Sequence, residues 1–264
     1  MNRVTVSNRR PIREFRDRVL AREKLLGIFI KSCDFASIEI IGTRTDLDFV
    51  VLDLEHSSYT YRELHSCILA ARSCSLPVVV RVAGSNSEYV SQSLDGGASG
   101  MMFPRISGPQ EAEYAIGQTR FENGTRGFSL SHRAAQYGSL TEEQFVKHND
   151  GNILRAVQIE DAEGVDKAEK IATTNDVDLI FVGPADLGLA LKASAGEASD
   201  LEMHIAEVGQ SSLRVGTAAG IYLSSAASLD EYIGLGFSVF VMSTDQAILA
   251  AGVNSLVTEF RRQI

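Results

Sequence analysis

Short apolar runs rich in Val, Ile and Phe recur along this 264-residue chain, and polar or turn-forming residues separate them. Runs of this length and composition are typical of β-strands, and near-continuous apolar character indicates strands that are buried on both faces. Eight strands are predicted in this way: Leu26–Lys31, Phe49–Leu54, Val78–Val82, Gly100–Pro104, Ile153–Glu160, Leu179–Val182, Ala218–Leu223 and Phe237–Met242.

Segments with helical periodicity lie between these runs, so that strand and helix alternate along the chain. The predicted helices are Phe35–Gly42, Tyr61–Arg72, Ser87–Gly96, Pro109–Thr119, Val165–Thr174, Leu201–Ser212, Leu229–Leu235 and Asp245–Arg262. Alternation of this kind predicts an α/β fold with a parallel sheet. Eight units favour a closed (β/α)₈ TIM barrel over an open sheet, and such barrels fill this length as one domain.

The regular alternation is interrupted at three places. Apolar residues at helical spacing after Pro11 predict a leading amphipathic helix within residues 1–25, before a barrel domain over residues 26–264. The connection from Arg120 to Asn152 holds an aromatic and glycine-rich loop and a polar helical piece, and long connections commonly belong to active sites or interfaces. Gly188–Asp200, rich in Ala, Gly and Ser, is predicted to be flexible.

Charge and composition narrow the classes of protein. The formal net charge is −9, and residues 1–24 carry eight Lys or Arg against three Asp or Glu, which leaves 17 basic and 31 acidic residues in the rest. A body this acidic is not expected to bind nucleic acid. Acidic residues also argue against a mitochondrial leader at the basic start, and the absence of a long apolar run argues against a membrane span. We therefore expect a cytoplasmic protein, with its three cysteines as idle thiols.

Polar residues at the ends of predicted strands are the candidates for chemistry, because barrel enzymes place their functional groups there. Asp53, Glu55 and His56 end or follow one strand, and Arg81 ends the next. Histidine titrates near neutral pH, so His56 is either a general base or a structural residue. A buried Arg81 requires an anion, which could be a protein carboxylate or a substrate oxygen.

Two further strand ends carry candidate metal ligands. Gln158 and Glu160 are two residues apart, so both side chains point to the same face of a strand. Asp186 follows the next predicted strand, which would bring its carboxylate near that of Glu160. Hard oxygen ligands suit Mg²⁺, Mn²⁺ or a similar ion. Alternatively, the two carboxylates cap helices or pair with surface arginines.

Taken together, five motifs resemble the HpcH/HpaI family of class II pyruvate aldolases, in the HpcH/HpaI aldolase/citrate lyase superfamily. Their order and spacing both match, and weaker similarities extend the resemblance from about residue 26 to residue 252. The motifs are Leu52-Asp53-Leu54-Glu55-His56, Val80-Arg81-Val82, Leu94-Asp95-Gly96-Gly97-Ala98, Val157-Gln158-Ile159-Glu160 and Gly183-Pro184-Ala185-Asp186-Leu187.

The resemblance implies a metal-dependent lyase that reversibly cleaves a 4-hydroxy-2-oxo acid to pyruvate, or a related 2-oxo acid, and an aldehyde. It implies Mg²⁺, Mn²⁺ or Co²⁺ on Glu160 and Asp186, with Lewis-acid stabilisation of the enolate. Gln158 and the backbone around Ala185 would help to hold the 2-oxo acid.

The resemblance also assigns roles to the remaining candidates. Arg81 would bind the keto oxygen, and His56, oriented by Asp95, would move the proton at the aldol hydroxyl. Asp53 and Glu55 would support these groups. The C-terminal helix would be exchanged between subunits of a homo-oligomer, a trimer or a hexamer.

Three alternatives make different demands. A class I aldolase needs a Schiff-base lysine, and Lys31 is the only lysine at a predicted strand end. An acyl-CoA lyase similar to the citrate lyase β subunit would share the metal carboxylates. A non-catalytic barrel subunit would not be stabilised by pyruvate with a divalent metal.

Overall fold

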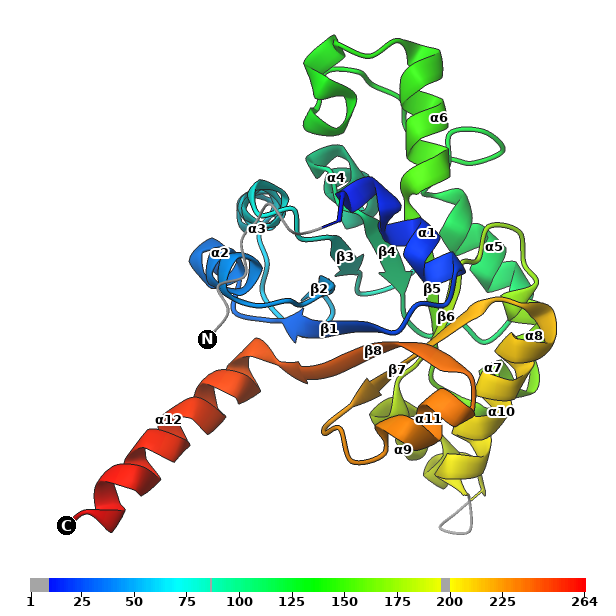
Figure 1. Ribbon diagram of the computed structural model, residues 1–264. Helices are drawn as coiled ribbons and strands as arrows, with labels where there is room; N and C mark the ends of the chain where they lie inside the picture. Colours follow the sequence, from blue (N-terminus) through cyan, green and yellow to red (C-terminus); the bar gives the residue numbers. More distant parts are fainter. Residues whose placement is uncertain (1–9, 86, 196–199) are drawn as a thin grey trace.

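Eight parallel strands close into a barrel in the computed structural model, which describes residues 10–85, 87–195 and 200–264 (Figure 1). Each strand pairs with its neighbours in chain order, and β1 pairs with β8 to complete the closure. All eight predicted strands are confirmed to within two residues at either end. The strands are β1 (Leu25–Ile30), β2 (Phe49–Asp53), β3 (Val78–Arg81), β4 (Gly100–Phe103), β5 (Leu154–Ile159), β6 (Leu179–Val182), β7 (Ala218–Leu223) and β8 (Phe237–Thr244).

Helices surround the barrel and link successive strands, which confirms the predicted (β/α)₈ TIM barrel. They are α2 (Phe35–Arg44), α3 (Tyr61–Ser73), α4 (Tyr89–Gly96), α5 (Pro109–Gly117), α6 (Glu142–Asn152), α7 (Ala162–Asp166), α8 (Ala168–Ala172), α9 (Pro184–Ala195), α10 (Leu201–Val215), α11 (Leu229–Gly234) and α12 (Asp245–Arg262). The helix predicted over Val165–Thr174 is thus two short helices, α7 and α8.

The prediction of a flexible stretch from Gly188 to Asp200 is wrong for its first eight residues, which continue α9. Ala and Leu are strong helix formers. Leu187 and Leu191, one turn apart on α9, are buried against the core, so packing also holds this helix. Residues 196–199 lie outside the described part of the chain.

The barrel interior is filled by apolar side chains from alternate strand positions. One buried cluster includes Phe49 and Val51 of β2, and Phe181 of β6. Residues just before the barrel form a 3₁₀ helix, η2 (Ile12–Glu14), and the helix α1 (Phe15–Leu20). Phe15 is buried in the same cluster, with its ring centroid 5.3 Å from that of Phe49. The leading helix therefore covers the amino-terminal end of the barrel.

The long connection between α5 and β5 projects from the barrel beside α4 as a second 3₁₀ helix, η3 (Arg133–Gly138), followed by α6 (Figure 1). Arg126 anchors it, because its buried guanidinium binds Asp95 at 2.7 Å and lies over the ring of Phe121.

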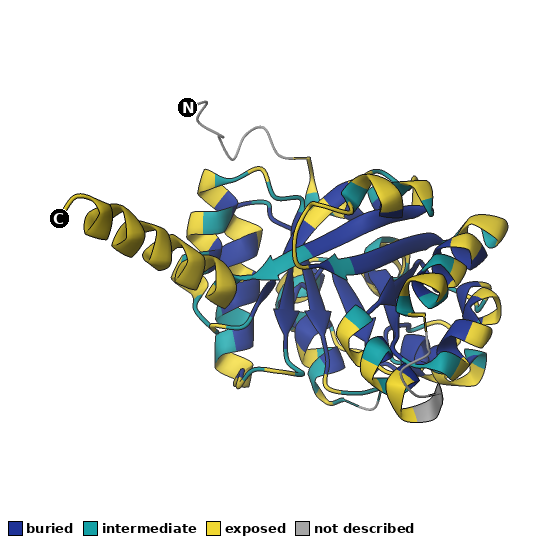
Figure 2. Ribbon diagram, turned by 90° about the horizontal axis from the view of Figure 1, so that it is seen from below, coloured by how far each residue is buried: buried dark blue, intermediate teal, exposed yellow. Residues whose placement is uncertain are grey.

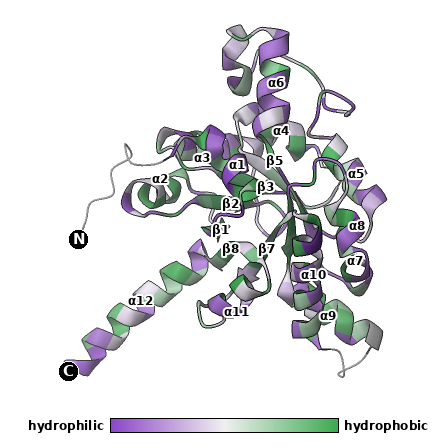
Figure 3. Cartoon of the chain, turned by 45° about the vertical axis from the view of Figure 1, so that its right-hand side comes forward, coloured by the Kyte–Doolittle hydropathy of each residue, from purple (hydrophilic) through white to green (hydrophobic). Residues whose placement is uncertain are grey.

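The helix α12 differs from the other α-helices that the structure describes in its relation to the core. It points away from the barrel, and none of its residues is buried (Figures 1 and 2). Apolar residues nevertheless recur along it (Figure 3), including Leu249 and Leu256, which are 70% and 67% exposed. Within the described residues, no helix is long and apolar enough to cross a membrane.

Candidate active site

A cavity of about 260 Å³ opens at the carboxyl-terminal end of the barrel, where the strand-end residues converge. Five of the predicted site residues line it: His56, Arg81, Gln158, Ala185 and Asp186. The remaining lining residues are Phe29, Lys31, Phe181, Gly183, Pro184, Tyr222 and Thr244. The positions of these residues follow from the barrel, because the carboxyl ends of parallel strands meet at one rim.

Asp53 is the centre of a buried charge network. It is fully buried at the end of β2 and accepts hydrogen bonds from Arg81 Nε at 3.0 Å and Arg81 Nη2 at 2.8 Å. Lys31 Nζ lies 3.2 Å from the same carboxylate. Burial alone would raise the pKa of Asp53, but the Arg81 and Lys31 charges hold it below its ordinary value. Asp53 therefore stays ionised and fixes both cations.

Arg81 is held in a single orientation by groups on several sides. Besides its two bonds to Asp53, its guanidinium carbon lies 4.4 Å from the centroid of the Phe29 ring. Its remaining nitrogen, Nη1, is 3.5 Å from Glu55 Oε2. The sequence predicts that a buried Arg81 pairs with either a protein carboxylate or a substrate oxygen. The structure supplies the protein carboxylate. Arg81 also lines the cavity, so the structure leaves it accessible to a substrate oxygen.

Gln158 and Glu160 share the inward face of the chain at the end of β5. Gln158 Nε2 donates to Glu160 Oε1 at 2.6 Å, and the backbone N–H of Arg105 donates to Glu160 Oε2 at 3.0 Å. Gly183 leaves the necessary room, since a Cβ there would lie 2.7 Å from Gln158 Nε2 and 2.8 Å from Glu160 Oε1. The glycine after β6 is therefore required by the side chains of β5.

The electrostatics around Glu160 are those of a site with surplus negative charge. Burial raises the pKa of Glu160 to about 7, and the neighbouring carboxylates of Glu55 and then Asp186 add to this shift. Asp186 lies in the first turn of α9, directly after Ala185. The free N–H groups of such a turn favour an anionic group, which suits the carboxylate of a substrate.

These residues fit a hard divalent cation. Glu160 and Asp186 supply carboxylate oxygens, and water or substrate oxygens commonly complete the coordination of such ions. Two buried oxygens beside them, Glu55 Oε2 and Gln158 Oε1, have no hydrogen-bond partner among the described residues. In the part of the chain that the structure describes, no three His, Cys, Asp or Glu side chains form a complete cage of protein ligands.

His56 and Asp95 are placed at opposite ends of the barrel within one chain. His56 follows β2 at the cavity, with its side chain 51% exposed and its Nε2 3.8 Å from Glu55 Oε2. Asp95 lies near the end of α4, which leads into the start of β4. There it accepts a hydrogen bond from Arg126 Nη2 at 2.7 Å, and its carboxylate lies 3.2 Å from His132 Nε2. A single chain therefore does not form the predicted pair.

Sequence reasoning missed two cationic groups beside the site. Lys31 was considered only as a Schiff-base lysine, whereas the structure pairs it with Asp53. Arg105 follows β4 with a left-handed φ of 56°, and its Nη1 lies 3.5 Å from Glu55 Oε1. The same strand-end rule that selected Arg81 could have selected both of them.

Fold and site together define a barrel enzyme with a pocket of charged residues at the carboxyl-terminal rim, and comparisons with known proteins agree. The family model described as HpcH/HpaI aldolase/citrate lyase matches residues 25–247. The hydroxypyruvate/pyruvate aldolase of Paraburkholderia phytofirmans is 30% identical over 93% of this chain and 96% of its own. A 5-keto-4-deoxy-D-glucarate aldolase of Shigella boydii is 29% identical over 94% of this chain and 96% of its own.

A solved structure agrees as well. An HpcH/HpaI aldolase/citrate lyase family protein of Burkholderia cenocepacia superposes with a TM-score of 0.86 at 30% identity. The match covers 94% of this chain and 99% of that one. The chain therefore belongs to the HpcH/HpaI aldolase/citrate lyase family, and it is an aldolase, a carbon–carbon lyase.

Proposed function

We propose that this aldolase depends on a divalent metal and reversibly cleaves a 4-hydroxy-2-oxo acid to pyruvate, or a related 2-oxo acid, and an aldehyde. The observation that carries the proposal is that Arg81 and Asp186 line one cavity at the carboxyl-terminal rim, with the buried Glu160 carboxylate close to both. The names of the two aldolase relatives and the general metal dependence of the family support it.

Glu160 and Asp186 would hold Mg²⁺, Mn²⁺ or Co²⁺, and the ion would supply Lewis-acid stabilisation at the 2-oxo acid. Gln158 keeps Glu160 in place through their 2.6 Å hydrogen bond. The backbone at Ala185, in the first turn of α9, would bind the substrate carboxylate. Together, the metal and these protein groups would hold the 2-oxo acid in one orientation.

Arg81 would donate to the keto oxygen as negative charge develops there. Asp53 orients this arginine through two bonds, and Glu55 lies 3.5 Å from its third nitrogen. His56, which is half exposed at the rim, would take or return the proton of the aldol hydroxyl. Arg81 reaches the cavity from the end of β3 and His56 from the segment after β2, so a substrate in the cavity would meet both.

Asp95 would orient His56 only if it came from a neighbouring copy of the chain, because the two lie at opposite ends of one barrel. A homo-oligomer, a trimer or a hexamer, is consistent with the exposed apolar face of α12. We propose that α12 is exchanged between subunits in that assembly. Sedimentation of native protein and of Leu249→Glu tests this, since the variant should dissociate; an unchanged sedimentation coefficient would contradict the exchange.

The decisive experiment is a screen of pyruvate with a set of aldehydes in the presence of Mg²⁺, Mn²⁺ or Co²⁺, with product masses as the readout. We expect aldol products that disappear with EDTA and return when metal is restored. Activity that resists EDTA, together with borohydride trapping of pyruvate on Lys31, would instead establish Schiff-base chemistry.

A further inference from the structure

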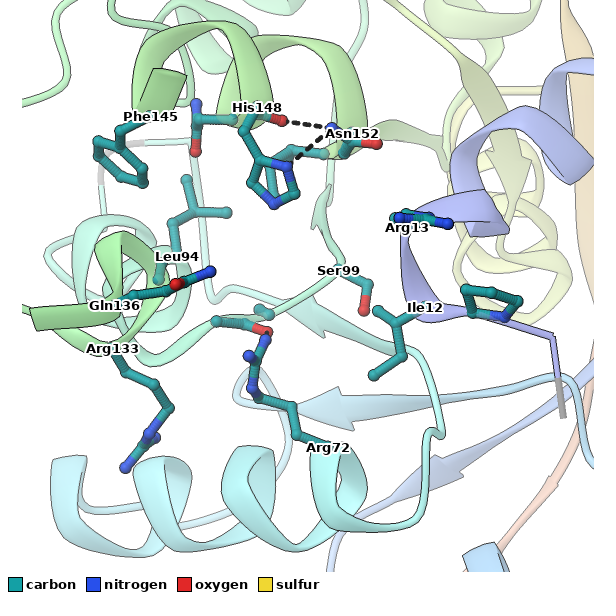
Figure 4. A pocket seen from close by; sticks show the side chains of 16 residues that line it. Ile12, Arg13, Arg72, Leu94, Ser99, Arg133, Gln136, Phe145, His148 and Asn152 are labelled. Carbon is teal, nitrogen blue, oxygen red and sulfur yellow. Dashed lines mark hydrogen bonds between the residues drawn. The ribbon is translucent and has the colours of Figure 1, made fainter. Parts of the chain in front are cut away.

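A second cavity, of about 350 Å³, lies at the opposite end of the barrel from the candidate active site (Figure 4). Its walls are formed by η2, η3, α6, the ends of α3 and α4, and the residues that enter β4 and β5. These segments precede strands, so the cavity lies at the amino-terminal end, where barrel enzymes do not place catalytic groups. The aldolase groups of the same chain therefore do not explain this cavity.

Three arginines gather around this cavity although the chain as a whole is acidic. Arg13, Arg72, Arg133 and His148 line it, and no Asp or Glu is among the described residues of its lining. The formal net charge of the chain is −9. Because acidic residues outnumber basic ones in this chain, a random placement of charged residues would be expected to put carboxylates in this lining.

The cations are close enough to disfavour one another. Burial lowers the pKa of Arg72, and the charge of Arg133 lowers it further. Burial likewise lowers the pKa of His148, with additional effects from Arg72 and Arg13. A bound anion would remove this mutual repulsion.

Arg72 is seated by the backbone of the turn between α4 and β4. Its Nη1 donates to the carbonyl of Gly97 at 3.2 Å. Gly97 has a φ of +95°, and a Cβ at this residue would lie 2.7 Å from Arg72 Nη1. Glycine is therefore required both by the turn and by the guanidinium that rests on it. Among the residues that the structure describes, Arg72 makes no other hydrogen bond, and its side chain lines the cavity.

Neutral hydrogen-bonding groups complete the cavity. Ser99 is 7% exposed, and its Oγ accepts the Val78 N–H at 3.1 Å while its hydroxyl points between Arg72 and Ile12 (Figure 4). No acceptor for that hydroxyl hydrogen occurs among the residues that the structure describes. Asn152 Nδ2 lies 3.3 Å from His148 Nδ1, and the imidazole hangs from α6 over the cavity toward Arg72.

We propose that this cavity binds a compact multivalent oxyanion, with Arg72 and His148 on either side of it and Ser99 donating from the floor. Guanidinium groups pair in a planar fork with phosphate and carboxylate oxygens. The shared ligand chemistry is therefore that of a phosphate-bearing or polycarboxylate small molecule. The ligand would act on the enzyme from the end of the barrel that holds α1, not as a substrate.

Isothermal titration calorimetry tests the proposal. The metal-loaded protein is titrated with inorganic phosphate and, separately, with malonate, at fixed ionic strength in chloride buffer. The comparison shows whether the cavity binds phosphate, carboxylate groups or both. We expect saturable binding at one site per subunit for at least one of them. Arg72→Gln should weaken it by about tenfold or more, because a charge-assisted hydrogen bond is lost. Arg44→Gln, an exposed arginine on α2 outside the cavity, should bind like native protein.

Two further measurements distinguish this site from the aldolase pocket. Glu160→Gln should retain anion binding, since Glu160 belongs to the other end of the barrel. The His148 imidazole resonances, assigned with His148→Gln, should titrate at higher pH when the anion is saturating. Absence of saturable binding, or equal loss in Arg72→Gln and Arg44→Gln, would overturn the proposal.

Discussion

The two ends of the barrel differ in the charged groups that surround their cavities: carboxylates and cations are mixed at one end, and the lining of the other holds arginines without a carboxylate among its described residues. At the carboxyl-terminal end, Glu55, Glu160 and Asp186 crowd together, and burial with these neighbours raises the pKa of Glu160 to about 7. At the amino-terminal end, Arg72 is surrounded by other cations, and burial and Arg133 lower its pKa. A cation would relieve the repulsion among the carboxylates around Glu160, and an anion would relieve the repulsion between Arg72 and Arg133.

Removal of a carboxylate at the carboxyl-terminal end should have the largest effect. Glu160→Gln should lower kcat/KM for aldol cleavage on the order of 10³-fold, because a metal ligand is lost while the shape of the side chain is kept. It should also remove the thermal stabilisation by metal and pyruvate. Glu163→Gln, an exposed position on α7, is the matched control and should behave as native protein. Metal-stimulated activity in Glu160→Gln would refute the ligand assignment.

Asp53→Asn should cause the largest loss of stability, about 3–5 kcal/mol, because Arg81 and Lys31 would stay buried without their counter-ion. Urea unfolding measures it. Asp46→Asn, an exposed carboxylate, should change stability by less than about 0.5 kcal/mol. Equal midpoints for the two variants would show that the buried network contributes little.

The Asp53 network also predicts a pH dependence of stability. Its folded-state pKa is lowered, so its contribution is present above the unfolded pKa near ~3.9 and is lost as pH falls through the lower folded value. The difference in unfolding free energy between native protein and Asp53→Asn should accordingly shrink below about pH 4. A difference that stayed constant down to the lowest accessible pH would contradict this.

His56→Ala should have a smaller effect, a fall of about 10²-fold in aldol cleavage, as expected for loss of one proton-transfer group. Exchange of the pyruvate α-protons should continue at the native rate, because His56 acts on the aldol hydroxyl. Proton exchange followed by NMR separates the two steps. Parallel loss of both reactions would assign His56 to enolisation instead.

Gly97→Ala, at the amino-terminal end, should have the smallest effect. The φ of +95° and the 2.7 Å approach to Arg72 should destabilise the fold by about 1 kcal/mol and weaken oxyanion binding, with catalysis unchanged. Gly117→Ala is the control, since nothing lies within 4 Å of a Cβ there. A catalytic defect in Gly97→Ala alone would show that the two ends are coupled.

The barrel could be predicted from the sequence because the pattern of apolar residues that defines each strand is local. Val78–Val80 and Ala218–Leu223, for example, are short runs that are apolar on both faces, as expected of a covered parallel strand. The helix α9 was misread because its small residues suggest flexibility, while its stability comes from Leu187 and Leu191 packing on a core that the sequence does not reveal.

The candidate site could be predicted only in part. Gln158 and Glu160 follow from the period of a strand, and the structure joins them by a hydrogen bond. The bidentate pair of Asp53 with Arg81 depends on strand register, which places these residues opposite each other in β2 and β3. Along the sequence, the motif with Asp95 lies between the motifs of Arg81 and Gln158. In the structure, however, α4 runs toward the amino-terminal end of the barrel and places Asp95 there.

The root of α12 is built into the wall of the active-site cavity. Asp245 begins this helix and accepts the backbone N–H groups of Lys31 at 3.0 Å and Ser32 at 3.1 Å, while Thr244 lines the cavity itself. A helix with no buried residue is marginal in water on its own. Specific activity should consequently decline when the enzyme is diluted and recover with a lag when it is concentrated again. The catalytic rate per subunit would then depend on the protein concentration.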